Sequence, residues 1–403
     1  MKRILLGFIL STISSAVAGP DALLVTREKI LENGKVVVYT GVQRVAVGGV
    51  GLLEPILQSL KRPAQPARWV KDTTKGWIAI ERPGYYFDPV AAKRAYLDAL
   101  DAGKREFRLP VTYIGQFPTA DDFYNLGIRE LLAEGQTNFY GSIDSRIHNI
   151  RLATSRFEGV VIEPGETFSF LKTVGEISLR TGFQEAFVII GDKTETGVGG
   201  GVCQVSSTLF RAAYFAGLPI VERRHHSYQV GYYRPTGLDA TVYAPTQDFR
   251  FKNDTPGHLL ILTEIRGYNL IFRLFGTKDR SVEWSGPFIS NRVAAPPPRY
   301  IMDSSLPPGH RKQIDFAAPG ARVIVRRSIR FDDGRTVDDT LVSNYRPWGA
   351  IYLVGPTPPP PQPKPQEVVP TPIQPPVPAP AAQPQNPAIP VYRPLPPQPP
   401  SSP

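Results

Sequence analysis

Apolar and polar residues alternate along the first part of the chain with the two-residue period of β-strands. Strands are expected on this basis over residues 23–47, 76–80 and 107–111. Helices are expected over residues 52–60, 88–102 and 119–132. The second helix has a clear start, because Asp88-Pro89 supplies a capping side chain and a proline in the first turn. The segment 19–136 is therefore predicted to be a small α+β domain.

The middle of the chain predicts short strands around one helix. Strands are expected over residues 157–170, 183–190, 220–233, 241–243, 249–252, 259–265 and 270–275. The last two are joined at Gly267-Tyr268-Asn269, which is typical of a hairpin turn. The helix is expected to begin near Cys203 and to end at Gly217-Leu218-Pro219. This pattern predicts a central domain over 137–280, with a core helix packed on a mainly antiparallel sheet.

The last part of the chain changes composition twice. After Pro296-Pro297-Pro298, residues 303–355 alternate in strand fashion and turn at Asp332-Asp333-Gly334, which predicts a small all-β module over 296–355. Many of the 43 prolines then fall in residues 356–403, where there is almost no charge and too little apolar surface to form a core. We expect a disordered, polyproline-like tail that acts as a spacer or docks a partner. The fold class predicted for the whole chain is α+β.

The first residues resemble a secretory signal peptide. Lys2-Arg3 precedes the apolar run 4–10, and Ala16-Val17-Ala18 suits cleavage after residue 18. The protein is therefore expected to be exported to the periplasm, the cell envelope or the outside of the cell. No segment is long and apolar enough to be a transmembrane helix.

The formal net charge of +10 narrows the choice of partners. A basic surface suits an anionic wall polymer or a membrane surface, and a purely solubilising charge is the alternative interpretation. Export argues against nucleic acid as a partner, as does the lack of a helix-turn-helix, zinc-finger or aromatic RNA-binding motif.

The single cysteine of the chain stands in the stretch most indicative of chemistry, Gly199 to Tyr243. Three glycines precede Cys203 and allow a tight turn and close approach by a ligand. At the start of a helix, the thiol pKa is expected to fall below its free value of about 8.5.

Two histidines and an aspartate follow the cysteine. His225 and His226 are adjacent, so on the predicted strand only one of them can face the thiol. Asp239 follows the turn Pro235-Thr236-Gly237 and is placed to orient the imidazole through its other ring nitrogen.

This stretch resembles the VanW-type family, named after a vancomycin-resistance accessory protein. The resemblance is carried by residues 200–209 (Gly-Gly-Val-Cys-Gln-Val-Ser-Ser-Thr-Leu), His226-Ser227, and 237–242 (Gly-Leu-Asp-Ala-Thr-Val). The family has its histidine directly before a serine, which selects His226 over His225. The resemblance implies a cell-wall-associated protein.

The flanking segments carry further resemblances. Residues 19–136 are similar in layout to the small peptidoglycan-binding domain that often precedes VanW-type domains. Residues 296–355 resemble G5-type domains of cell-wall proteins, which are thought to bind sugar or wall polymers. This second likeness is carried by Gly320, Gly334, Ser343-Asn344-Tyr345 and Gly355.

The order Cys, His, Asp also resembles the core of transglutaminase-like and papain-like cysteine enzymes. This resemblance implies a cysteine hydrolase or transpeptidase acting on peptidoglycan peptides, in which Cys203 attacks, His226 relays the proton and Asp239 orients it. The expected substrate or oxyanion contacts are Gly200, Gly201, Gln204, Ser206 and Ser207.

Two other interpretations of the same residues remain open. The glycine-rich loop and helix start suit a carboxylate or phosphate of peptidoglycan or another wall polymer, in a protein without catalysis. In the other, Cys203 packs in a structural module whose His and Asp hold a turn. No cofactor is expected. A metal site of His225, His226, Asp239 and Asp248 matches no familiar ligand spacing.

Overall fold

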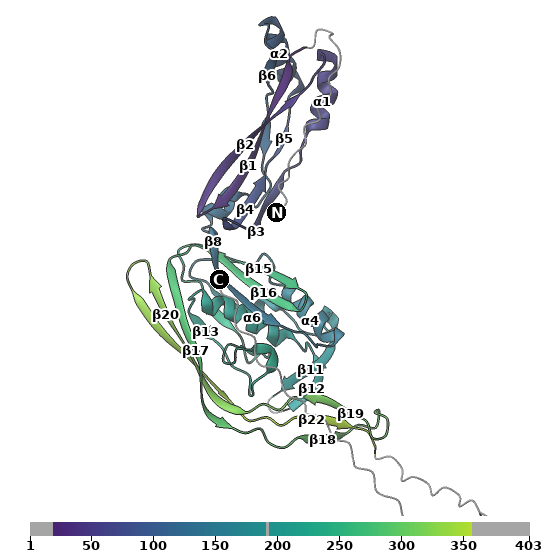
Figure 1. Ribbon diagram of the computed structural model, residues 1–403, viewed down its shortest axis with the longest axis vertical. Helices are drawn as coiled ribbons and strands as arrows, with labels where there is room; N and C mark the ends of the chain where they lie inside the picture. Colours follow the sequence, from purple (N-terminus) through teal and green to yellow (C-terminus); the bar gives the residue numbers. More distant parts are fainter. Residues whose placement is uncertain (1–18, 191–192, 357–403) are drawn as a thin grey trace, which may run out of the picture. The chain divides into compact units, whose positions relative to one another are not determined.

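The computed structural model describes residues 19–190 and 193–356 (Figure 1). The signal peptide predicted over 1–18 and nearly all of the tail predicted over 356–403 lie outside the described residues. Within the described ranges no helix has the length and apolar character needed to cross a membrane.

The first region is built on a five-stranded sheet. Its strands are β1 (Asp21–Glu32), β2 (Lys35–Val45), β3 (Gln65–Asp72), β4 (Gly76–Arg82) and β6 (Glu106–Arg108). Their order is β2-β1-β4-β3, and β6 runs parallel to β1. The alternating run predicted over 23–47 is a hairpin, because Asn33 and Gly34 both take positive φ and turn the chain between β1 and β2.

Two helices and a small strand pair complete this region. The helices α1 (Leu53–Leu60) and α2 (Pro89–Asp101) lie where the sequence predicts them. Asp88 caps α2 by accepting a hydrogen bond from the Val90 N–H, with proline in the first turn. The strands β5 (Gly84–Tyr86) and β7 (Thr112–Ile114) pair with each other.

The helix predicted over 119–132 is wrong in its second half. Helix α3 covers only Ala120–Asn125, and strand β8 (Glu130–Asn138) follows. A Thr119–Asp122 capping box starts the helix, and Gly127 at φ 78° turns the chain after it. The apolar residues that suggested a helix instead complete a sheet.

That sheet supports the candidate site. It has the antiparallel order β8-β16-β15-β9, with β9 (Val161–Ile162), β15 (Leu259–Arg266) and β16 (Asn269–Gly276). The helix predicted near Cys203 is α6 (Val202–Phe215), and twelve of its fourteen residues are buried. At Gly135 of β8 an added Cβ would lie 2.2 Å from the Thr208 carbonyl oxygen, so the helix backbone lies directly on the strand. The predicted α+β class, with a core helix on an antiparallel sheet, is confirmed.

Shorter elements surround α6. They are α4 (Asp144–Ser155), α5 (Phe170–Val174), the three-stranded sheet β10 (Thr167–Ser169), β14 (Arg250–Lys252) and β13 (Ile220–Glu222), and the hairpin β11 (Glu185–Ile190) with β12 (Lys193–Val198). The sequence did not predict α4, which is rich in polar residues. The strand predicted over 157–170 is two short strands, β9 and β10. The strand predicted over 220–233 ends at Glu222; an irregular segment follows, with a 3₁₀ turn at Gly231–Tyr233.

The C-terminal strands form two sheets. One has the order β17 (Arg280–Val293), β20 (Gly320–Phe331), β21 (Thr336–Tyr345), and the other β18 (Arg299–Met302), β22 (Ile351–Val354), β19 (Arg311–Asp315). Because β17 pairs with β20, the strand pairing starts before the boundary expected at residue 296. Val325 of β20 belongs to the same buried cluster as Leu209 of α6, so this unit packs onto the core that carries the site.

Candidate functional site

Cys203 is the second residue of α6, at the positive end of the helix dipole. The glycines before it are required by the backbone, since Gly199 and Gly201 take φ of 88° and 108°. At Gly200 an added Cβ would lie 2.6 Å from the Phe187 carbonyl oxygen. The expected tight turn is therefore present, and the thiol is only partly buried.

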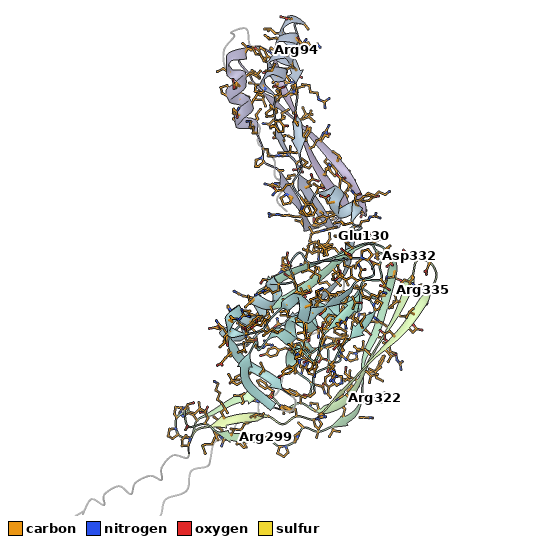
Figure 2. The ribbon with its side chains drawn as sticks, turned by 180° about the vertical axis from the view of Figure 1, so that it is seen from behind. Arg94, Glu130, Arg299, Arg322, Asp332 and Arg335 are labelled. Atoms are coloured by element: carbon orange, nitrogen blue, oxygen red, sulfur yellow. The ribbon has the colours of Figure 1, made fainter. Side chains whose placement is uncertain are left out.

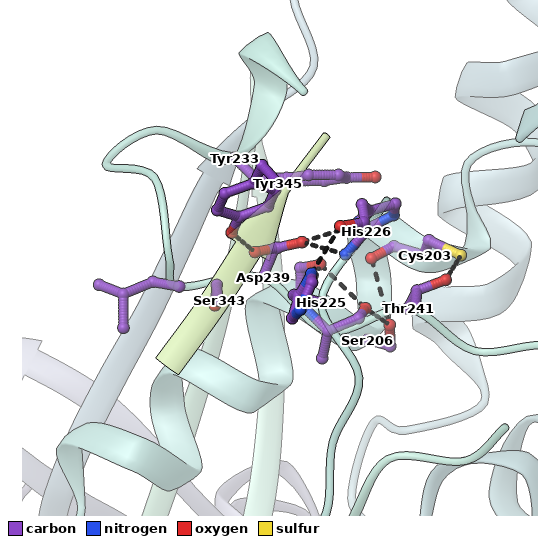
Figure 3. A network of polar contacts seen from close by, with 12 residues as sticks. Cys203, Ser206, His225, His226, Tyr233, Asp239, Thr241, Ser343 and Tyr345 are labelled. Atoms are coloured by element: carbon purple, nitrogen blue, oxygen red, sulfur yellow. Dashed lines mark hydrogen bonds and ion pairs between the residues drawn. The ribbon is translucent and has the colours of Figure 1, made fainter. Parts of the chain in front are cut away.

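His226 lies between Cys203 and Asp239 (Figure 3). The His226 Nδ1 is 2.6 Å from Asp239 Oδ2, and the His226 main-chain N–H donates to the same oxygen at 2.8 Å. The side chains of His226 and Cys203 share a hydrogen bond. Because Nδ1 is bound to the carboxylate, we assign the hydrogen bond with the thiol to the other ring nitrogen, Nε2. The three residues predicted as a functional set are thus brought together.

These contacts shift the pKa values of all three groups. Burial alone would raise the pKa of Cys203, but the hydrogen bond and charge of His226 outweigh it and lower the pKa below its usual value. Burial would lower the pKa of His226, but the contacts to Asp239 and Cys203 raise it to about 9. Burial likewise opposes the charge on Asp239, yet His226 and Arg223 hold its pKa well below the usual range. The site therefore favours a thiolate next to an imidazolium.

His225 points elsewhere. Its Nδ1 lies 2.7 Å from the His226 carbonyl oxygen, and its Nε2 accepts from the Asn344 N–H at 3.2 Å. Burial lowers its pKa. The adjacent histidines do face different ways, although the segment is not the strand that suggested this.

Two serines predicted as substrate contacts are fully buried. Ser206 Oγ donates to the Ala240 carbonyl at 2.5 Å, and Ser207 Oγ donates to the same carbonyl at 3.1 Å. Ser207 also accepts from the Ala240 N–H at 3.0 Å. Both side chains thus tie α6 to the residue after Asp239, so they position the site from inside the protein.

Gln204 is also fully buried. Its Oε1 accepts from Arg146 at 2.7 Å, and its amide nitrogen donates to Thr137 Oγ1 at 3.1 Å. Gln204, Ser206 and Ser207 are therefore bound inside the protein, while Gly200 and Gly201 form the turn directly before the first turn of α6.

Three residues that contact His226 or Asp239 were not predicted from the sequence. Tyr233 stacks on the His226 ring at 4.7 Å, and the Tyr345 hydroxyl donates to Asp239. Arg223 donates to the Asp239 carbonyl at 2.6 Å. Arg223 lies close in sequence to the histidines, and its charge was the available clue; Tyr345, 106 residues from Asp239, had none.

Asp248 does not join the histidines. Its carboxylate accepts from Ser169 Oγ at 2.6 Å and from the Leu171 N–H at 2.9 Å, at the start of α5. Across residues 19–190 and 193–356, no group of three or more His, Cys, Asp or Glu side chains is placed to hold a metal ion.

Comparison with known proteins identifies the central segment. Residues 145–275 match the family model described as VanW like protein. Over 146 residues the chain is 42% identical to the uncharacterized protein YoaR of Bacillus subtilis, a match that covers 36% of this chain and 48% of YoaR. Over 141 residues it is 29% identical to the vancomycin B-type resistance protein VanW of Enterococcus faecalis, covering 34% of this chain and 51% of that protein. The matches thus span about half the length of these relatives.

One solved structure, the crystal structure of HP0197-G5, covers 19% of this chain and 99% of its own. Its sequence identity is 19% and its TM-score 0.10, so this likeness carries no argument about the fold.

Proposed function

Because the chain contains a VanW-like domain, we propose that it is an exported, cell-wall-associated protein whose central domain is a thiol enzyme acting on peptidoglycan peptides. The observation that carries the proposal is the contact of a partly buried cysteine at a helix start with a histidine whose other nitrogen is held by a buried aspartate. A histidine bound on both sides in this way is what activation of a nucleophile requires.

The proposed reaction is acyl transfer. The Cys203 thiolate attacks the carbonyl carbon of a peptide bond, and the main-chain N–H of Cys203 stabilises the oxyanion. The neighbouring N–H groups of Val202 and Gln204 already donate to the Gly199 and Gly201 carbonyls, at 3.1 and 2.9 Å. The His226 imidazolium then gives its proton to the leaving amine, which leaves an acyl group on the sulfur. Water, or the amine of a second peptide, attacks the acyl group while His226 takes back a proton. Hydrolysis or transpeptidation results.

The test is the pH dependence of Cys203 alkylation by iodoacetamide in the folded protein. We expect the rate to titrate below the free-thiol pKa of about 8.5. In His226→Ala we expect the midpoint to rise above it, because burial of the thiol then acts without the compensating charge. His225→Ala is the matched control and should leave the midpoint unchanged. A wild-type cysteine that titrates at or above the free value, or reacts only after unfolding, contradicts the proposal.

A second candidate function is binding of an anionic wall polymer without catalysis. Arg322, Arg326 and Arg330 are exposed on one face of β20, alternating with buried residues (Figure 2 labels Arg322). Their partners across β17 and β21 are uncharged Ser, Thr and Asn residues, while Glu283 and Asp338 flank Ser328 on the same face. At four-residue spacing the guanidinium groups are about 13 Å apart along the strand. This row favours a charged polymer over a small ligand.

A further inference from the structure

Tyr345 is the last residue of β21 and lies outside residues 145–275, the segment that matches the VanW family model. Its hydroxyl donates to Asp239 Oδ1 and accepts from the Gly237 N–H at 3.0 Å. We propose that Tyr345 is a positioning residue of the site, through which the C-terminal strands hold the Asp239 carboxylate in the orientation that His226 needs. This inference rests on the proposed function of the Cys203 site.

The two oxygens of the Asp239 carboxylate have separate partners. Oδ2 accepts both hydrogen bonds from His226, at 2.6 and 2.8 Å. Oδ1 accepts from Tyr345, with the Arg223 guanidinium farther away at 3.4 Å. A carboxylate bound at one oxygen can still rotate, whereas one bound at both has its plane set. Tyr345 supplies the shorter of the two contacts at Oδ1 and thus the main restraint on that rotation.

The end of β21, which carries Tyr345, lies against the irregular segment that carries the histidines (Figure 3). Arg223 donates to Ser343 Oγ at 3.0 Å, and the Asn344 N–H donates to His225 Nε2 at 3.2 Å. The next residue after Tyr345, Arg346, donates its N–H to the Ser227 carbonyl at 2.7 Å. Four consecutive residues, 343–346, therefore bind the site or the segment next to it. The segment that carries His226 has no strand ladder to hold it in place, and these hydrogen bonds from the end of β21 hold it instead.

Tyr345 is suited to act as a permanent donor. Its side chain is buried at 6% exposure. Its pKa is raised above the usual range, mostly by burial and to a smaller extent by the charge of Asp239. The hydroxyl therefore keeps its proton over the whole pH range in which a thiolate–imidazolium pair exists, and it holds the carboxylate without exchanging a proton with it.

The test is Tyr345→Phe, which removes the hydroxyl and keeps the ring. We expect the rate of Cys203 alkylation at pH 7 to fall about tenfold, the effect of losing one hydrogen bond to a charged group. The midpoint of the pH profile should move up toward the free-thiol value, because a mobile carboxylate stabilises the His226 imidazolium less well. The profile is the decisive measurement, since a purely structural tyrosine would not move it in a protein that remains folded.

Two matched variants serve as controls. Ser343→Ala removes the contacts of Ser343 Oγ with Arg223 and with the Tyr345 hydroxyl but leaves Asp239 Oδ1 its donor, so it measures what docking of the strand contributes. Tyr214→Phe removes a buried hydroxyl of α6 for which the described residues show no hydrogen-bond partner. Tyr214→Phe should keep the wild-type profile and Ser343→Ala should shift it less than Tyr345→Phe does, and thermal unfolding checks that all three variants are folded.

The outcomes separate this inference from the proposed function. A shift that is larger in Tyr345→Phe than in Ser343→Ala, with none in Tyr214→Phe, supports the positioning role. If the wild-type thiol titrates below the free-thiol value and Tyr345→Phe has the same midpoint, only the positioning role is overturned. The positioning role is also overturned if Ser343→Ala shifts the midpoint as much as Tyr345→Phe does, because docking of the strand then accounts for the effect. If the wild-type thiol itself titrates at the ordinary value, the thiol enzyme is rejected and the positioning role with it.

Discussion

At the scale of single residues, Asp239 is the centre of the site. It is 2% exposed, and burying a carboxylate is costly unless charges and donors compensate. The compensation comes from Arg223 and His226, which lie in one segment of the chain, and from Tyr345, which is 106 residues from Asp239 in the sequence. The same contacts would also hold a purely structural turn. What distinguishes the enzymatic interpretation is that the network ends at a cysteine that remains partly accessible.

Asp239→Asn tests the charge in this network. We expect the His226 pKa to fall from about 9, because burial still disfavours the imidazolium and only the contact with Cys203 then opposes it. The imidazolium would then persist over a narrower pH range. Titration of the histidine ring signals by NMR measures this directly, with His225, which titrates below 6.5, as an internal reference. An unchanged His226 pKa would show that Asp239 does not stabilise the charged ring.

At the scale of elements, helix α6 organises the central domain. Its first turn presents Cys203, and its last turn is held from outside: Arg327 donates to the Tyr214 and Leu218 carbonyls at 2.7 and 2.9 Å. Arg280 donates to the Gly217 carbonyl at 3.1 Å. Guanidinium groups at a helix C-terminus satisfy unpaired carbonyls and the negative end of the dipole. The C-terminal strands therefore contact both Asp239, which binds the histidine of the site, and the C-terminal end of the helix that carries Cys203.

Gly135→Ala tests how closely α6 lies on the sheet. The new methyl group would stand 2.2 Å from the Thr208 oxygen and 2.6 Å from the Ala212 nitrogen, both main-chain atoms that cannot move aside alone. We expect the free energy of unfolding to fall by about 1–3 kcal/mol, as overpacking does, when measured by urea denaturation. The matched control is Gly51→Ala, where nothing lies within 4 Å; it should be neutral or slightly stabilising. Equal effects at both positions would mean that the helix has room to shift.

Elements were predicted best where the signal was local. The end of α6 at Gly217, the start of α2 at Asp88 and the hairpin turn at Gly267 follow from residue types within one turn of the chain. The failures lie where partners are distant. Residues 130–132 have helix-forming side chains, but β16 offers them a ladder and they become strand. Residues 223–230 alternate like a strand, but Arg223 and His225 bind β21 through their side chains, at the Ser343 hydroxyl and the Asn344 main-chain N–H, instead of through a strand ladder.

At the scale of the whole molecule, the net charge of +10 is the broadest clue to a partner. We predict that replacing Arg322, Arg326 and Arg330 together by Gln weakens binding to an anionic wall polymer and lowers the salt dependence of that binding. Cosedimentation with purified wall material at several salt concentrations measures both. The matched control removes the same charge from the exposed Lys93, Arg94 and Lys104 of the first region. Equal loss in both triple variants would show that net charge, and not the row on β20, is responsible.

The sequence by itself determined the local features of this protein: the helix that begins at Cys203, the glycines its entry turn requires, and the pairing of that cysteine with a histidine and an aspartate as a candidate set. The turn and the helix start depend on backbone geometry and residue types a few positions apart, and the candidate set depends on the order of Cys203, His226 and Asp239 along the chain. The family resemblance already favoured His226 over His225. Only the tertiary structure decided that Gln204, Ser206 and Ser207 turn inward and that Tyr345 meets Asp239 across 106 residues. Such contacts arise from the packing of β21 and α6 around a buried charge, and local residue patterns carry no information about which distant strand will supply a donor.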